Sequence, residues 1–89
     1  MLRVGIVGTG FMGAYHAAGW ARTPAHLVGF HSLDQGQIDR LIAQYGGRTF
    51  ATLDALLDAV DVVDICTPTH LHYDMVLQAA AKGKHIICE

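Results

Sequence analysis

The chain has 89 residues, of which 52% are hydrophobic and 16% are charged, and its formal net charge is −2. A domain of this size buries only about 60 to 65% of its unfolded surface, so this apolar composition favours a piece of a larger protein whose surface another segment covers. The near-neutral charge argues against nucleic acid or an anionic membrane as a partner, and with neither a membrane-span-length apolar run nor a signal peptide we expect a cytoplasmic protein.

Short continuous apolar runs alternate with stretches of helical hydrophobic spacing, which is typical of alternating strands and helices. The first run, Arg3 to Gly8, predicts a strand buried on both faces. A helix is then expected to begin near Phe11, with small residues along one stripe that packs close to the sheet, namely Ala14, Ala17, Ala18 and Ala21. A second strand is predicted at residues 26–31.

The middle of the chain predicts two further helices separated by a short strand at residues 48–50. The first of them ends at two glycines, Gly46 and Gly47, and its apolar residues are Ile38, Leu41, Ile42 and Tyr45. Thr52 is the expected N-cap of the next, whose apolar residues are Leu53, Leu56, Leu57 and Val60.

A fourth strand is predicted at residues 61–67, where Pro68 ends it. Thr69 is the expected N-cap of a helix over residues 70–82, and a last strand is predicted at residues 85–89. The resulting order, β-α-β-α-β-α-β-α-β, with short connections, predicts an α/β fold. It is a doubly wound parallel sheet with right-handed crossovers and helices on both faces.

The stretch VGIVGTGFMG, residues 4–13, contains the glycine pattern G-x-G-x-x-G between the first strand and the first helix. In that context Gly8 permits the sharp turn, Gly10 lets a pyrophosphate approach the backbone, and Gly13 lets the helix pack on the strand. The helix N-terminus then offers unpaired N–H groups to the phosphates. The alternative is that the glycines serve only the turn and the packing. The dinucleotide-binding interpretation gives the cofactor loop as Gly8, Thr9, Gly10, Phe11, Met12 and Gly13.

A dinucleotide site also needs a group for the adenosine ribose, about 20 residues past the last glycine, and that position is Ser32. Serine can hydrogen-bond a hydroxyl or a phosphate and does not repel a 2′-phosphate as a carboxylate would. The cofactor is therefore NAD or NADP. The alternative is that Ser32 with Gln35, or Asp34 with Gln37, forms a capping box for the next helix.

A second motif lies in DVVDICTPTHLHYD and the final HIICE. Together with GIVGTGFMG it resembles the amino-terminal half of the glucose–fructose oxidoreductase, inositol dehydrogenase and MocA family of sugar oxidoreductases, over nearly all 89 residues. The resemblance implies a Rossmann-like NAD(P)-binding domain over residues 1–89 of a two-domain enzyme. That enzyme transfers hydride to or from a sugar, polyol or related hydroxyl compound, and full-length members pair into homo-oligomers.

The resemblance also implies which residues lie beside the nicotinamide, by their match to the T-P and E-K-P motifs of the family. These are Thr67, Pro68, His72 and Glu89. The catalytic lysine of the family follows the glutamate, a position beyond Glu89, so no catalytic residue is assigned and the 89 residues alone are expected to be inactive. Because strand ends of a parallel sheet share one edge, these residues and the glycine loop are expected to meet there.

His70 and His72 form an H-x-H pair, but two imidazoles without further ligands are weak evidence, so we predict no metal. The remaining histidines show no spacing that indicates a site. Cys66 and Cys88 lie in apolar runs and are expected to be reduced. Two non-catalytic functions stay open beside the oxidoreductase: a module that senses a dinucleotide, and a scaffold that binds no nucleotide.

Overall fold

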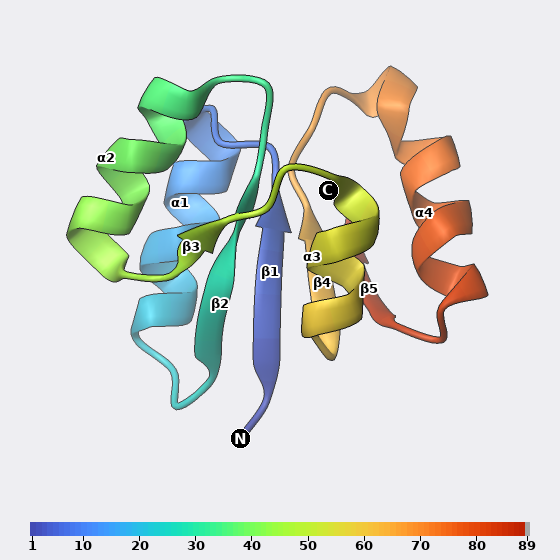
Figure 1. The fold of residues 1–89 in the computed structure, drawn as a ribbon, viewed down its shortest axis with the longest axis horizontal. Helices are drawn as coiled ribbons and strands as arrows, with labels where there is room; N and C mark the ends of the chain where they lie inside the picture. The colour runs from blue at the N-terminus through green and yellow to red at the C-terminus, as the bar shows by residue number, and fades with distance from the viewer. Residues whose placement is uncertain (89) are drawn as a thin grey trace.

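The structure, a computed structural model, describes residues 1–88. Within them one parallel sheet has the strand order β3-β2-β1-β4-β5, shown in Figure 1. The strands are β1 (Arg3–Val7), β2 (His26–His31), β3 (Arg48–Thr49), β4 (Val62–Ile65) and β5 (His85–Cys88). The helices are α1 (Phe11–Ala21), α2 (Gln35–Tyr45), α3 (Leu53–Ala59) and α4 (His72–Ala81), with a 3-10 turn η1 (Thr69–Leu71) before α4. The predicted doubly wound α/β fold is confirmed.

Two apolar layers hold the helices to the sheet, one on each face. Residues of β1 alternate between them: Ile6 packs with α1 and α2 around Phe30, while Val7 packs with α3 and α4 around Leu56. Figure 1 shows the two helix pairs on either side of the strands. Because both faces are covered, β4 is buried along its whole length, as its continuous apolar run predicts.

The segment after β4 differs from the prediction. Thr69 is not an N-cap: it begins the 3-10 turn, Pro68 precedes that turn, and α4 itself starts at His72. Pro68 has a backbone conformation that directs the chain out of the strand, and the tighter turn then sets the start of the regular helix. The third helix is also shorter than predicted, because Val60 leaves the helical conformation and its side chain is fully buried.

An ion pair joins the start of β1 to the residue before β4. The Arg3 guanidinium donates to Asp61 through Nη2 at 2.9 Å and through Nε at 3.2 Å, and the Arg3 backbone N–H donates to the same carboxylate at 2.9 Å. The hydrogen bonds from the Arg3 side chain, then from its backbone, lower the pKa of Asp61 to about 2. The pair therefore aligns these strands at the amino-terminal edge of the sheet.

We expect the Asp61 carboxylate to contribute to the loss of folding stability at low pH. Its pKa is lower in the folded chain than in the unfolded one, so its contribution is complete above about pH 4 and is lost as the pH falls through about 2. When urea unfolding is measured at several pH values from about 5 down to about 2, the free energy of unfolding should fall less steeply with pH for Asp61→Asn than for the wild type. Asp39→Asn, which removes an exposed acid on α2, is the control. Identical acid limbs for Asp61→Asn and the wild type would contradict the assignment.

Candidate functional site

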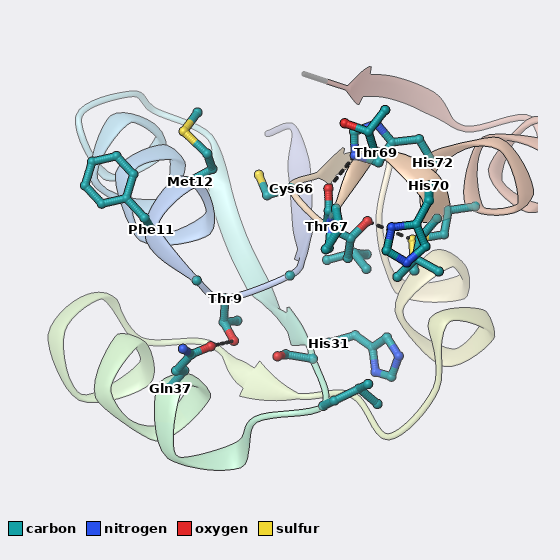
Figure 2. A pocket seen from close by; sticks show the side chains of 18 residues that line it. Thr9, Phe11, Met12, His31, Gln37, Cys66, Thr67, Thr69, His70 and His72 are labelled. Carbon is teal, nitrogen blue, oxygen red and sulfur yellow. Dashed lines mark hydrogen bonds between the residues drawn. The ribbon is translucent and has the colours of Figure 1, made fainter.

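A cavity of about 730 Å³ lies at the carboxyl-terminal edge of the sheet. Its walls come from the β1–α1 loop, the end of β2, and the segment between β4 and α4. Figure 2 shows Phe11 and Met12 on one side and Thr67, Thr69, His70 and His72 on the other. Its volume is in the range of small-molecule and cofactor sites, and its place is where open parallel sheets bind ligands.

The three glycines of the loop lie in three different environments. Gly8 has a φ of +94°, a conformation that favours glycine, and a Cβ there would lie 2.8 Å from the Cys66 carbonyl carbon. A Cβ at Gly13 would lie 2.0 Å from the Gly8 carbonyl oxygen. A Cβ at Gly10 would meet nothing within 4 Å. The fold therefore requires Gly8 and Gly13, whereas the space beside Gly10 is open to the cavity.

The backbone N–H groups of this loop are available to bind an anion. The Gly8 N–H donates to the His31 carbonyl at 2.9 Å. Among residues 1–88, the N–H groups of residues 9–13 have no acceptor in the protein, and α1 has no side-chain cap at Gly10. These groups sit at the positive end of the helix dipole, so they can donate to a phosphate without a basic side chain.

The loop is tied to α2 by a side-chain network. Thr9 is buried, and its hydroxyl donates to Gln37 Oε1 at 3.1 Å. Asp34 caps α2 by accepting from the Gln37 N–H, and the Asp34 N–H donates to Ser32 Oγ at 3.1 Å. The predicted cap at Asp34 is confirmed, but the capping boxes are wrong: Gln37 turns to Thr9, and Gln35 donates to Asp39 and Thr49.

On the other side of the cavity, the His72 ring holds the segment after β4 in place. Its Nε2 lies 2.5 Å from the Thr67 carbonyl oxygen, and its Nδ1 lies 3.0 Å from Cys88 Sγ. A carbonyl can only accept, so the proton is on Nε2, and Nδ1 accepts from the thiol. The Thr67 hydroxyl donates to Met75 Sδ at 3.3 Å. The ring thus links the end of β4, α4 and the end of β5.

The cavity brings together most of the residues predicted from the sequence. Those that line it are Gly8, Thr9, Gly10, Phe11, Met12, Ser32, Thr67, Pro68 and His72. Gly13 lies beneath the loop, against Gly8, and Glu89 lies outside the described residues. Sequence reasoning missed further lining residues, including His31, Leu33, Gln37, Cys66 and Met75. Their positions at strand ends and within helices carried no sequence signal that these side chains line the cavity.

A buried polar cluster adjoins this cavity and was also missed. Asp64 on β4 is 1% exposed and accepts from Trp20 Nε1 at 2.8 Å. His16 Nδ1 lies 2.8 Å from the same carboxylate oxygen, and Cys66 lies next to both groups. A carboxylate within the run VVDI carries no periodic signal, so its partners on α1 could not be inferred from spacing.

Comparison with known proteins gives a consistent result. Residues 2–89 match a family model described as an oxidoreductase family with an NAD-binding Rossmann fold. The chain is 32% identical to glucose-6-phosphate 3-dehydrogenase of Bacillus subtilis (strain 168) over 100% of its own length and 26% of that protein's. It is 35% identical to inositol 2-dehydrogenase of Rhizobium meliloti (strain 1021) over 99% and 27% of the two lengths.

Solved structures agree. The crystal structure of GenD2 from gentamicin A biosynthesis, in complex with NAD, superposes with a TM-score of 0.92 at 32% identity, covering 98% of this chain and 26% of that one. The chain thus spans about a quarter of the length of the relatives that it matches. Across residues 1–88, no helix is both long and apolar enough to span a membrane.

The loop geometry predicts that two alanine substitutions destabilise the fold to different extents. Gly13→Ala places a Cβ against the Gly8 carbonyl, and such overpacking against backbone should lower the free energy of unfolding by about 1–3 kcal/mol. Gly10→Ala meets open space and should lower it by no more than about 1 kcal/mol, the cost of alanine in place of glycine at the N-cap of α1. Urea denaturation of both variants checks this. Equal destabilisation of the two would show that the close approach at Gly13 does not exist.

Proposed function

Because the chain belongs to the oxidoreductase family with an NAD-binding Rossmann fold, we propose that residues 1–89 are the cofactor-binding domain of an NAD(P)-dependent oxidoreductase. The whole protein moves hydride between the nicotinamide and a hydroxyl-bearing carbon of a sugar, polyol or related compound. The observation that supports the proposal most is the row of N–H groups at residues 9–13, which open onto the space beside Gly10.

The loop binds the pyrophosphate through these N–H groups and the dipole of α1. Gly10 is needed because a side chain there would occupy the position of the phosphate oxygens. Thr9 contributes indirectly: its buried hydroxyl, bound to Gln37, fixes the loop against α2. Ser32, at the end of β2 and in the cavity wall, is the group for the adenosine ribose.

The nicotinamide lies toward the segment after β4, where Thr67 and Pro68 form the wall. His72 is a positioning residue in this scheme, because its two ring nitrogens are already used to hold the Thr67 carbonyl and Cys88. The cofactor itself supplies the hydride chemistry. Glu89 and the lysine expected after it would complete the site, with a proton-transfer role for the lysine.

The substrate class rests on the relatives. Their names specify dehydrogenation of a sugar phosphate and of inositol, both polyhydroxylated rings. The chain covers about a quarter of such proteins, so we assign substrate selection and homo-oligomer formation to the part of the protein outside these 89 residues. We propose that the 89 residues alone bind cofactor at most and turn over no sugar.

Calorimetric titration of the purified chain with NADH tests cofactor binding. We expect Gly10→Ala to weaken NADH binding about 10- to 100-fold while the fold stays intact, because its Cβ meets only space that the ligand needs. Gly19→Ala, within α1 and also with open space around its Cβ, is the matched control and should bind as the wild type does. If the wild type binds neither NADH nor NADPH, the nucleotide-free scaffold becomes the better interpretation.

A second titration tests where the ribose lies. Ser32→Asp introduces a carboxylate at the end of β2, which accepts from the ribose hydroxyls of NAD but repels the 2′-phosphate of NADP. We expect the ratio of NADPH to NADH dissociation constants to rise at least about 10-fold, a change of roughly 1.4 kcal/mol. Ser32→Asn, similar in size and uncharged, should leave the ratio near the wild-type value. An unchanged ratio in Ser32→Asp would place the ribose away from Ser32.

A further inference from the structure

Three potential metal ligands from two elements meet beside the cavity. Asp64 and Cys66 are two residues apart on and just after β4, so their side chains face the same side of the sheet. His16 comes from α1, which packs on that side. The ligand atoms of the three residues lie within 4.8 Å of one another. We propose that His16, Asp64 and Cys66 bind one divalent ion of the Zn²⁺ class.

The distances already resemble one face of a coordination tetrahedron. His16 Nδ1 lies 2.9 Å from Asp64 Oδ1, and Cys66 Sγ lies 3.4 Å from each of these atoms. Around a tetrahedral Zn²⁺ with ordinary bond lengths, such nitrogen, oxygen and sulfur ligands are about 3.3 to 3.6 Å apart. An ion could therefore be bound with shifts of only a few tenths of an ångström.

The chemistry and charge of the three groups also fit such an ion. Imidazole, thiolate and carboxylate are the ligands that Zn²⁺ takes in proteins. With His16 neutral, the Asp64 carboxylate and a Cys66 thiolate carry two negative charges, which a divalent cation neutralises in a place where Asp64 is only 1% exposed. Binding would release the thiol proton and move the His16 proton to Nε2.

Trp20 donates a hydrogen bond to the proposed carboxylate ligand, as groups around metal-bound carboxylates commonly do. Its Nε1 donates to Asp64 Oδ2 at 2.8 Å, which orients the carboxylate. His16 Nδ1 lies within 2.9 Å of both carboxylate oxygens, and Oδ1 is the one that Cys66 also contacts, so Oδ1 is the oxygen placed to bind the ion. Among residues 1–88 these three side chains supply three of the four ligands of a tetrahedral ion. Cys66 also lines the cavity, as Figure 2 shows, so the ion would border that space without involving the glycine loop.

Without a metal, the same atoms form a hydrogen-bond network that joins α1 to β4, so the experiment must separate the two. The chain is treated with EDTA, freed of chelator and titrated with Co²⁺, which takes the place of Zn²⁺. We expect one Co²⁺ per chain and a thiolate-to-cobalt charge-transfer absorption. Cys66→Ser should abolish that absorption and weaken binding at least about 10-fold, and Trp20→Phe should weaken it about 10- to 100-fold with the absorption retained.

Cys88→Ser is the matched control, because Cys88 is the other thiol and contacts His72 instead; its titration should equal that of the wild type. Failure of the folded wild type to bind Co²⁺, or a charge-transfer absorption that survives in Cys66→Ser or is lost in Cys88→Ser, would overturn the proposal. Circular dichroism confirms that each variant is folded. No readout involves NADH, so the result is independent of cofactor binding.

Discussion

The close approach of α1 to the end of β1 is the contact on which the site depends. The backbone at Gly13 lies so near the Gly8 carbonyl that no side chain fits between them. This contact fixes the start of α1 directly after a loop of a few residues, so the first N–H groups of the helix lie at the end of β1. The N–H groups of residues 9–13 therefore remain without acceptors in the described chain. An anion site here follows from backbone packing, before any polar side chain is considered.

Side-chain hydrogen bonds then fix the two sides of the cavity in place. On one side, the buried Thr9 hydroxyl joins the loop to α2 through Gln37. On the other, the His72 ring joins the Thr67 carbonyl to Cys88. Both ring nitrogens of His72 are engaged within the protein, so His72 acts mainly as a support. The single bond between Thr9 and Gln37 positions the loop and leaves the Thr9 lone pairs and the Gln37 amide N–H groups able to form further hydrogen bonds. Gly10, Ser32 and Pro68 present surface to the cavity, and they are the better candidates for direct contact with a ligand.

The sequence predicted the order of elements and most of the cavity lining because both follow from local rules. Strand ends of a parallel sheet meet at one edge, so Gly8, Ser32 and Thr67 were expected together. The errors have local causes as well. A proline after a strand can precede a 3-10 turn as easily as a capped helix, which is why Thr69 was misassigned. The Asp64 cluster depends on which helix crosses β4, a tertiary property that periodicity does not report.

Charge gives the final link between fold and function. Among the described residues that line the cavity there is no lysine or arginine, although the proposed ligand carries a diphosphate. Arg40 lies in a smaller neighbouring pocket beside Gly10. The attraction for the anion must therefore come mainly from oriented N–H groups, whose partial charges act over short distances and only in one geometry. A basic side chain would attract any phosphate, whereas a fixed row of N–H groups selects an anion of the right shape. In the proposed function, recognition of the diphosphate is thus a property of the backbone, and the lining side chains would distinguish the two ends of the dinucleotide.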